Sequence, residues 1–347
     1  MKLQILIPQY TETDEIVKPL LDSIALQQNV DFSQIGVIIC NDGSGVFLSD
    51  ALLHAYPFRV EYYKEPHRGV SGTRNACFER STAEYVMFCD ADDLFYNACG
   101  LWIVFREMEN GGFDSLTSAF VEETRAMQDM PAMQGQHALR KGDVLYVNHN
   151  IDSTFVHGKI HRRAYLAEQG IRWNEALTIH EDSYFNILCQ SLSENVKYCP
   201  TPFYLWRWRD DSVCRHDPKY ILKTYNNMLD SNEALLDELL RHGKQDKAKF
   251  YATMMVFDAY YTMNKPEWIN QENRAYRDAT ERRFARYYEK RRELWEAMPE
   301  AEKMAISNQV RARSITEGMK MEAVTVEGWL KKMRELASGK EPAESPP

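Results

Sequence analysis

The chain has 347 residues, of which 44% are hydrophobic and 27% are charged, and its net charge is −9. This length and composition indicate a globular protein with a sizeable core, large enough for one domain and an appendage. The acidic balance excludes a global basic field that would draw the protein to nucleic acid or to an anionic membrane, although it leaves room for local basic patches.

The cysteines and the apolar runs bear on location. Seven cysteines lie at positions 40, 77, 89, 99, 189, 199 and 214, and no pair has CxxC spacing. An odd, scattered set favours free thiols in a reducing compartment over a disulfide framework or a zinc site. The opening MKLQILIPQY is too short for a signal peptide, and no stretch approaches the length of a transmembrane segment. We therefore expect a cytoplasmic location, with peripheral docking at a membrane left open.

Short apolar runs alternate with segments of helical spacing in the first part of the chain. Strands are predicted at 3–7, 35–40, 58–64 and 84–89, and helices at 15–28, 46–55, 70–81 and 99–109. This alternation predicts an α/β fold, a Rossmann-like mostly parallel sheet with helices on both faces. Ligands of such sheets bind beyond the carboxyl ends of the strands. The polar clusters at 8–12, 41–44 and 90–93 each follow a strand, so they should gather at one edge.

The rest of the chain divides at about residue 215. Before it, strands and long loops surround a helix predicted to start near Glu181. After it, glycine nearly vanishes, and helices are predicted at 217–242, 246–264, 270–296 and 299–337. We expect a domain at 1–215, an α-helical C-terminal region at 216–337 and a disordered tail at 338–347.

An acid cluster ends the fourth predicted strand, where EYVMFC runs into Asp90, Ala91, Asp92 and Asp93. Carboxylates this close repel one another and are rarely buried unpaired. They are either solvated turn residues or ligands of a cation such as Mg²⁺ or Mn²⁺, with positions left open for a diphosphate. The pattern alone leaves both readings open.

Two other strand ends carry polar groups of weaker meaning. Asp42, in NDGS, could accept a hydrogen bond from a nucleobase N–H, but this tetrapeptide is also good turn chemistry. HRGVSGTRN supplies Arg68, Arg74 and two glycines before a helix, whose N-terminus would favour phosphate. It matches neither the dinucleotide fingerprint nor the P-loop.

Six segments in order carry a definite resemblance: ILIPQYTE, VIICNDGS, HRGVSGTRNACFERSTAEYVMFCDADD, HGKIHRRAYL, IHEDSYF and YLWRWRDDSVCR. Over roughly residues 1 to 215 they resemble the family 2 nucleotide-sugar glycosyltransferases of the GT-A fold. None of the motifs is very specific alone, and their shared order gives the resemblance its strength.

The resemblance implies a role at each matching position. On the donor side it places the nucleotide loop, the base-reading aspartate and the segment near the diphosphate, which are Pro8, Tyr10, Glu12, Asp42, Arg74, Asn75, Asp90 and Ala91. Arg68 and Arg209 are further donor-side candidates, and Lys159 matches a family lysine with a structural or donor-side role. Asp90 and Asp92 match the DxD motif and would bind Mn²⁺ or Mg²⁺, with His216 as a candidate third ligand. Asp182, in HED, matches the catalytic base, and Glu181 and Trp208 would lie on the acceptor side.

Some of these positions also allow plainer readings. Glu181 and Asp182 could simply cap a helix. Trp208 and Arg209 could belong to a core strand with solvated arginines, and His216 could be a surface histidine. Asn41 stands where the family usually has a second aspartate, and Gln9 and Thr11 also depart from the first loop. These departures weaken the assignment of UDP, because the family also uses GDP- and dTDP-sugars.

The basic stretch NRAYRDATERRFARYYEKRREL, residues 273–294, is interleaved with aromatic residues. One interpretation is an acceptor platform for a polyanion such as teichoic acid, nucleic acid or a lipid headgroup. The other is an amphipathic helix whose aromatics pack on neighbours and whose charges are solvated. Homo-oligomerisation through these helices is also open.

The sequence thus predicts a metal-dependent inverting glycosyltransferase that moves a sugar from a nucleotide diphosphate sugar, with UDP favoured, to a hydroxyl acceptor. The expected acceptor is a surface glycan such as capsule, O-antigen or teichoic acid, or its lipid-linked form. Modified nucleic-acid bases in a viral setting are an alternative acceptor. A silent nucleotide-sugar-binding module or a nucleotidyltransferase are alternatives of another class. A silent module should have lost the acids at the metal and base sites, which are all present here. A nucleotidyltransferase needs a glycine-rich loop after the first strand, which PQYTETDE lacks.

Overall fold

The structure is a computed structural model that describes residues 1–123, 146–148, 154–207, 219–315 and 319–339. The chain forms two compact units, Met1–Ser212 and Val213–Pro347, and each is described by itself. The predicted boundary at 215 falls in the segment 208–218, outside the described residues, as does the predicted tail from residue 340 onward.

The first unit is an α/β sheet protein. Its strands are β1 (Leu3–Gln9), β2 (Ile35–Asn41), β3 (Arg59–Lys64), β4 (Tyr85–Phe88), β5 (Leu94–Phe95), β6 (Ser115–Glu122), β7 (Tyr146–Asn148), β8 (Lys159–Arg162) and β9 (Val196–Trp206). Its helices are α1 (Asp14–Ala25), η1 (Phe32–Gln34), α2 (Asp50–Leu53), α3 (Gly69–Arg80), α4 (Gly100–Glu109), α6 (Arg163–Glu168) and α7 (Glu181–Leu192).

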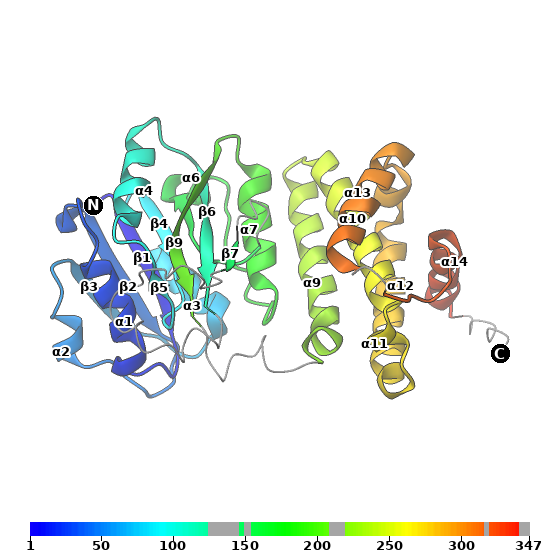
Figure 1. Cartoon of the computed structure of the whole chain (residues 1–347), viewed down its shortest axis with the longest axis horizontal. Coiled ribbons are helices and arrows are strands. Elements are labelled where there is room, and N and C mark those ends of the chain that lie inside the picture. The colour runs from blue at the N-terminus through cyan, green and yellow to red at the C-terminus, as the bar shows by residue number, and fades with distance from the viewer. Residues whose placement is uncertain (124–145, 149–153, 208–218, 316–318, 340–347) are drawn as a thin grey trace. The chain divides into compact units, whose positions relative to one another are not determined.

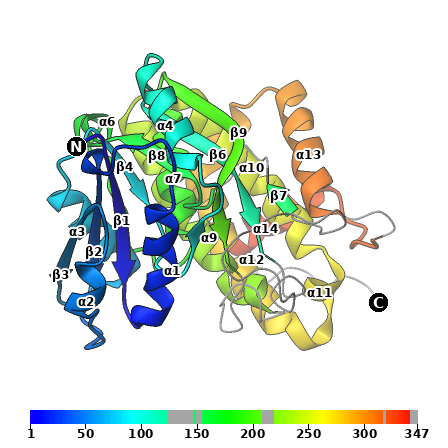
Figure 2. The same cartoon turned by 60° about the vertical axis from the view of Figure 1, so that its left-hand side comes forward.

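The described strands form one sheet in the order β3-β2-β1-β4-β8-β6-β9-β5, and β7 pairs with β6 (Figures 1 and 2). The β1–β2, β2–β3, β1–β4 and β6–β9 pairs are parallel, and the pairs that involve β8, β5 and β7 are antiparallel. The predicted mostly parallel sheet is therefore confirmed. Parallel β1, β2 and β4 bring their carboxyl ends to a single edge.

Helices pack on both faces of the sheet because the central strands β1, β2 and β4 bury apolar side chains on each side in turn. Met87 of β4 belongs to the core cluster that includes Leu20 of α1 and Val104 of α4. The adjacent Phe88 points the opposite way and packs edge-on against Phe185 of α7, with ring centroids 5.4 Å apart. With both faces packed, variation is left to the loops at the strand ends.

Two predicted helices are shorter than expected. The helix predicted at 46–55 forms only at Asp50–Leu53, because the Val46 carbonyl is bound by the side chains of Gln9 and Asn41 at 3.1 and 2.9 Å. The helix predicted at 15–28 ends at Ala25. There the Gln27 side chain bonds the carbonyl of Asn97 at 2.9 Å instead of continuing the helix.

Gly158, directly before β8, has no room for a side chain. Its φ is +63°, and an added Cβ would lie 2.2 Å from the Ser118 hydroxyl oxygen. Gly170 has a similar φ of +65° but faces open space. We expect Gly170→Ala to lower the free energy of unfolding by roughly 1–2 kcal/mol of left-handed strain, and Gly158→Ala by that strain and by the cost of turning the Ser118 hydroxyl away from the Ala119 carbonyl that it bonds. Denaturant unfolding of both variants measures the difference, and equal losses would contradict the clash.

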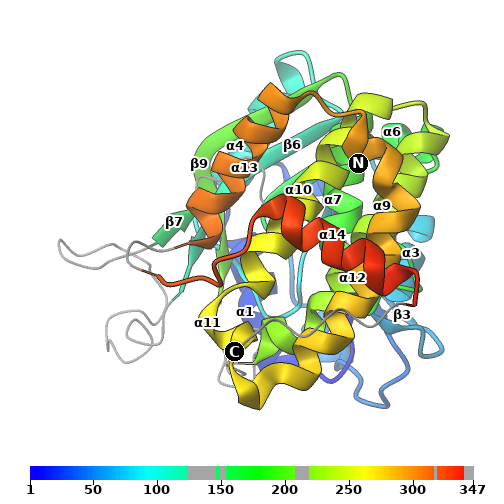
Figure 3. The same ribbon diagram turned by 90° about the vertical axis from the view of Figure 1, so that its right-hand side faces the viewer.

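The regular elements of the second unit, over its described residues, are all helices. Its elements are α9 (Tyr220–Arg241), α10 (Gln245–Met263), α11 (Pro266–Ile269), η2 (Gln271–Asn273), α12 (Arg274–Glu296), α13 (Glu300–Ser314) and α14 (Val326–Ala337). Within it α10 packs on α9, α12 and α13, and α14 packs on α12 (Figure 3). No described helix has the length and apolar character needed to cross a membrane.

The prediction of one long helix at 299–337 is wrong, because the structure has two helices there, α13 and α14. Residues 319–325 are not helical. They are tied to α10, where Glu322 N donates to the Asn264 carbonyl at 3.1 Å and the Tyr260 hydroxyl donates to the Val324 carbonyl at 2.6 Å. Thr325 then caps α14, since its hydroxyl accepts from Gly328 N at 3.1 Å.

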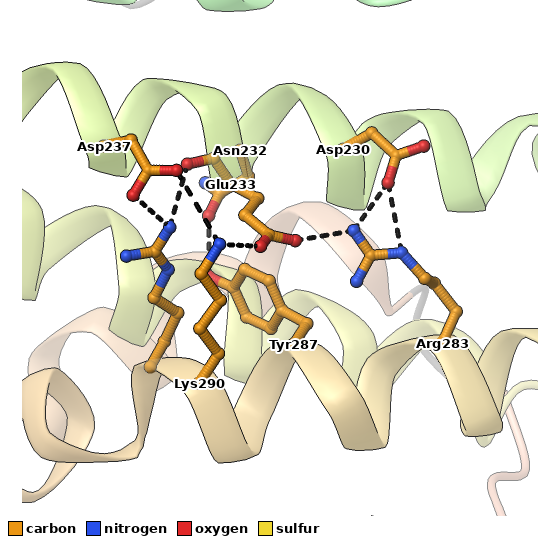
Figure 4. Close-up of polar contacts among 8 residues, drawn as sticks. Asp230, Asn232, Glu233, Asp237, Arg283, Tyr287 and Lys290 are labelled. Carbon is orange, nitrogen blue, oxygen red and sulfur yellow. Dashed lines mark hydrogen bonds and ion pairs between the residues drawn. The ribbon is translucent and has the colours of Figure 1, made fainter.

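The basic stretch at 273–294 is built into the unit as an amphipathic helix. Arg283 on α12 binds Asp230 and Glu233 of α9 at 2.5 and 2.6 Å (Figure 4). The Tyr287 hydroxyl donates to Asn232 at 2.7 Å, and Phe284 is fully buried. Because these cations and aromatics are engaged within the unit, the structure favours the packing interpretation over the polyanion platform.

Candidate active site

A cavity of about 410 Å³ opens where β1, β2 and β4 end, beside the start of α3. It gathers the three polar clusters that the sequence placed at strand ends. Its lining residues are Pro8, Gln9, Tyr10, Glu12, Asp42, His67, Gly69, Val70, Thr73, Arg74, Asp90, Ala91 and Asp92.

A buried amide pair shapes the floor of this cavity. Asn41 Nδ2 donates to Gln9 Oε1 at 2.5 Å, and Gln9 Nε2 donates to the Glu12 carbonyl at 2.8 Å. The Tyr62 hydroxyl also donates to Gln9 Oε1, at 3.1 Å. Two departures from the family pattern, Gln9 and Asn41, are thus partners of each other. They join the last residues of β1 and β2, and Asn41 is not among the residues that line the cavity.

Asp42 lies at the far end of the cavity, where its carboxylate is held by two donors. Oδ1 accepts from Arg68 N at 2.6 Å, and Oδ2 is 2.9 Å from His67 Nδ1. The His67 ring lies 5.2 Å from the Tyr10 ring, centroid to centroid. Tyr10 N in turn donates to Glu12 Oε2 at 2.7 Å. An aromatic pair and a carboxylate therefore border the place where a flat heterocycle could lie.

The N-terminus of α3 faces the same cavity through Gly69, Val70 and Thr73. The first backbone N–H groups of a helix have no partner within the helix, and with the helix dipole they favour an anion. Gly69 has φ +75° and open space at its Cβ position, so a ligand can approach the backbone here. This end of the helix suits a phosphate.

Arg74 connects this cavity with a helix far along the chain. Nη2 binds Asp90 Oδ1 and Nη1 binds Glu181 Oε1, both at 2.9 Å, across sequence separations of 16 and 107 residues. Its guanidinium also lies 4.3 Å from the Trp173 ring centroid. The two carboxylates hold the pKa of Arg74 above its usual value despite burial. Arg74 thereby fixes Glu181 relative to the acid cluster.

The three acids after β4 have different surroundings. Asp90 and Asp92 line the cavity, with Ala91 buried between them. Asp93 is buried behind them, where it accepts from the Tyr204 hydroxyl at 2.5 Å and from Arg207 N at 3.0 Å. Burial and the neighbouring acids Asp92 and Asp90 raise the pKa of Asp93 well above its usual value. Asp93 anchors the end of β9, whereas Asp90 and Asp92 can meet a ligand.

Asp182, in the first turn of α7, has a pKa well above that of an ordinary aspartate. Burial raises its pKa to about 7, and the adjacent Glu181 adds to the rise, while Arg74, the Ser183 N–H and Lys159 act in the opposite direction. A base with a pKa near the working pH is the most effective proton acceptor. The preceding His180 has φ +62°, a strained backbone for a non-glycine residue, and it begins the turn into α7.

Three residues expected on the donor side lie elsewhere. The Arg68 side chain binds Glu175 at 2.6 Å. Asn75 is buried and exchanges hydrogen bonds with the backbone of Trp173, at 2.9 and 3.0 Å. Lys159 is 2% exposed and interacts electrostatically with Asp182. None of the three is among the residues that line the cavity.

The sequence interpretation missed several lining residues, including His67 and Thr73. His67 directly precedes Arg68, which the sequence did single out, but no motif marks His67 itself. Trp208, Arg209 and His216 lie outside the described residues. Among the described residues, no three His, Cys, Asp or Glu side chains form a metal-ligand group.

The sheet is mostly parallel, with two carboxylates after β4, an aspartate after β2 and the N-terminus of α3 beside them. This is the arrangement of a GT-A fold that binds nucleotide sugars. Residues 4–167 match the family model described as glycosyl transferase family 2. The matched residues are a little under half of the chain, and over them the chain is similar to this family.

Relatives and solved structures agree with that assignment. The chain is 24% identical over 221 residues to the uncharacterised glycosyltransferase EpsJ of Bacillus subtilis, an alignment that covers 61% of this chain and 62% of EpsJ. Over 124 residues it is 27% identical to a Rickettsia bellii glycosyltransferase, covering 35% of this chain and 17% of that protein. The chain thus spans less than two thirds of these relatives.

Solved structures share the fold at low identity. The crystal structure of S. aureus TarS 1–349 superposes with a TM-score of 0.61 at 14% identity, covering 98% of this chain and 92% of that one. The mannosyltransferase PcManGT of Pyrobaculum calidifontis, in complex with GDP-Man and Mn²⁺, gives a TM-score of 0.50 at 13% identity, covering 96% and 84%.

Proposed function

We propose that the protein transfers a sugar, with inversion, from a nucleoside diphosphate sugar to a hydroxyl group of a glycan. The observation that carries the proposal is the Arg74 bridge. It ties Asp90 of the cavity to Glu181, the neighbour of the candidate base, through two 2.9 Å contacts. Donor site and base thereby belong to one assembly.

The donor would occupy the cavity lengthwise. The Tyr10–His67 pair and the Asp42 carboxylate suit a nucleobase with a ring N–H that can donate, which both uracil (N3–H) and guanine (N1–H) offer. The α3 N-terminus suits the diphosphate. We favour a UDP-sugar, and the fold relative TarS 1–349 has been solved with UDP-GlcNAc. The fold relative PcManGT has been solved with GDP-Man, so a GDP-sugar is the alternative donor.

Asp90 and Asp92 fit a hard divalent cation. Both line the cavity, and 34% of the Asp90 side chain is exposed. Mg²⁺ and Mn²⁺ prefer oxygen ligands and are commonly held by one or two carboxylates together with substrate phosphates. Bound Mn²⁺ or Mg²⁺ would neutralise negative charge on the departing diphosphate. His216 remains the candidate third ligand.

The chemical step needs one carboxylate from this chain. The acceptor oxygen forms a bond to the anomeric carbon while the bond from that carbon to the diphosphate oxygen breaks. The hydroxyl proton passes to the Asp182 carboxylate. Glu181, which Arg74 binds at 2.9 Å, would help to bind the acceptor. The glycan would be a surface polymer such as capsule, O-antigen or teichoic acid.

A nucleotide panel tests the donor site. A ligand present at 100 times its dissociation constant should stabilise the folded state by about 2.7 kcal/mol. We expect UDP and its sugars to raise the melting temperature with Mn²⁺ or Mg²⁺ present, and less without metal. Asp92→Asn should lose the metal-dependent part while keeping the part due to the nucleotide alone. If GDP alone stabilises the protein, uracil is wrong; if no nucleotide does, the donor site itself is wrong.

A further inference from the structure

A second cavity, of about 270 Å³, lies within the helical unit. Residues of α11, η2, α12 and α14 line it, together with the segment at 319–325 that interrupts the predicted last helix. The charged residues among its described lining are three cations and three carboxylates, which are Arg274, Arg277, Asp278, Glu281, Glu322 and Lys332. Their formal charges cancel, so this lining is strongly polar and electrically balanced.

Ion pairs between separate elements hold the deeper side chains in place. Lys332 Nζ of α14 donates to both carboxylate oxygens of Glu281 on α12, at 2.9 and 2.8 Å. Arg277 Nε donates to Glu281 Oε1 at 3.1 Å, and its Nη2 donates to Glu322 Oε2. Only 14% of the Arg277 side chain and 5% of the Glu281 side chain are exposed. A ligand would therefore meet groups that are already oriented, which lowers the entropic cost of binding.

The segment at 319–325 supplies one acid of the lining, Glu322. Its backbone N donates to the Asn264 carbonyl at 3.1 Å, and the Tyr260 hydroxyl donates to the Val324 carbonyl at 2.6 Å. These bonds fix the segment on α10, while 43% of the Glu322 side chain stays exposed. The break between α13 and α14 thus places an accessible carboxylate at the cavity.

The lining keeps hydrogen-bonding capacity for a ligand. A guanidinium group has five N–H donors, an ammonium group has three, and an ionised carboxylate accepts at about four positions. The contacts of Arg277 and Lys332 with Glu281 and Glu322 use only part of this capacity. Arg274 and the nearby Asp278, 3.7 Å away, add a further donor and acceptor at an exposed position. Donors and acceptors therefore lie side by side around the cavity.

This balance of charges selects the class of ligand. A phosphate would approach three carboxylates and a metal ion three cations, so each would meet repulsion along with attraction. A sugar hydroxyl carries no charge, and it can donate to a carboxylate while it accepts from an arginine or lysine. Ile269, which is 40% exposed, adds apolar surface for the C–H groups of a ring. The volume lies a little under the roughly 300–1,000 Å³ of sites for drug-sized ligands, which suits one sugar ring.

We propose that this cavity binds one uncharged sugar ring of the acceptor glycan, a ring other than the one whose hydroxyl reacts. The assignment to the acceptor rests on the proposed function, whereas sugar binding follows from the cavity alone. A second contact of this kind would hold a polymer between transfers and raise the effective concentration of its acceptor hydroxyls. It differs from a polyanion platform, because the cations that line the cavity are paired with carboxylates that line it too.

Saturation-transfer NMR on the full chain tests the site, with the methyl glycosides of glucose, galactose, mannose and N-acetylglucosamine as probes. We expect at least one of them to bind. Its dissociation constant should rise about tenfold or more in Glu322→Gln, because a hydrogen bond to a charged group is lost. Arg274→Met changes a side chain that is 69% exposed, so it carries the test if Glu322→Gln fails to fold.

Glu300→Gln is the matched control. Glu300 also pairs with a lysine of this unit, Lys303, at 2.7 Å on α13, and it does not line the cavity. The dissociation constant of the glycoside should therefore be unchanged in this variant. Inorganic phosphate is the second probe, and we expect it not to bind at the cavity.

The outcomes separate this inference from the proposed function. Glycoside binding that weakens in Glu322→Gln or Arg274→Met, but not in Glu300→Gln, supports the sugar site even if no transfer is ever detected, in which case the proposed function fails alone. Binding that both cavity variants leave unchanged, or no binding of any of the four glycosides, overturns the site. Phosphate binding that Arg274→Met abolishes would also overturn it, because the cavity would then be an anion site.

The assignment to the acceptor has its own readout once transfer is detected. Glu322→Gln should raise the KM for a polymeric glycan acceptor and leave the KM for a single-sugar acceptor as it is. An unchanged KM for the polymer, in a variant that has lost glycoside binding, would overturn the link between this cavity and the acceptor.

Discussion

Asp182→Asn should lower the rate of sugar transfer by about 10²–10⁴-fold, the usual contribution of a positioned general base. The amide has nearly the shape of the carboxylate but cannot accept the proton of the acceptor hydroxyl. Asp182 is not among the residues that line the donor cavity, so affinity for the nucleotide should be unchanged. Single-turnover transfer and calorimetric binding of the nucleotide measure the two quantities separately.

The pH profile sharpens this prediction. Burial raises the pKa of Asp182 to about 7, so the wild-type rate should climb as pH rises through neutrality. An ordinary exposed aspartate, with a pKa near 4, would give a flat profile there. The residual rate of Asp182→Asn should lose this limb. Substantial activity in the variant with the limb still present would remove Asp182 as the base.

The sequence determines the sheet and its functional edge well, because both depend on local patterns. Apolar runs at 3–7, 35–40 and 84–89 each form a strand within two residues of the predicted bounds. Polar residues directly after a parallel strand must lie at its carboxyl end. For this reason Asp42 and Asp90 could be placed at one edge without any knowledge of the loops.

What the sequence could not supply is the set of contacts between distant segments. Arg74 meets Glu181 across 107 residues, and Asn75 meets Trp173 across 98. Such pairs leave no periodic trace in one chain. The same limit hid the pairing of Gln9 with Asn41, which seemed to be two separate departures from the family. Their hydrogen bond shows that the two substitutions form one unit.

In the helical unit, composition predicts helices but not where they break. The segment at 319–325 is not helical, and its backbone bonds to α10, a tertiary effect that outweighs local propensity. The charges of α12 look like a free basic surface in sequence. Whether they are free depends on Asp230, Glu233 and Asp237, which lie about fifty residues earlier on α9.

Arg74→Met should cost both stability and donor binding. The side chain lies between Asp90 and Glu181, and without it two carboxylates would face each other and the buried Trp173 ring. Removing one partner of a buried ion pair typically costs about 3–5 kcal/mol. We expect the lower end of that range, because 34% of the Asp90 side chain remains in contact with water. Denaturant unfolding measures the loss.

Two further variants separate the bridge from the charge. Arg74→Lys keeps the charge, but a single ammonium group cannot reproduce the fork that binds two carboxylates, so it should recover only part of the stability. Arg80→Met removes an arginine from the other end of α3, where it binds Glu65, and should leave nucleotide affinity unchanged. In Arg74→Met that affinity should fall, because Asp90 loses the contact that orients it toward the donor. An Arg74→Met protein with wild-type stability and nucleotide affinity would mean that donor site and base are positioned independently.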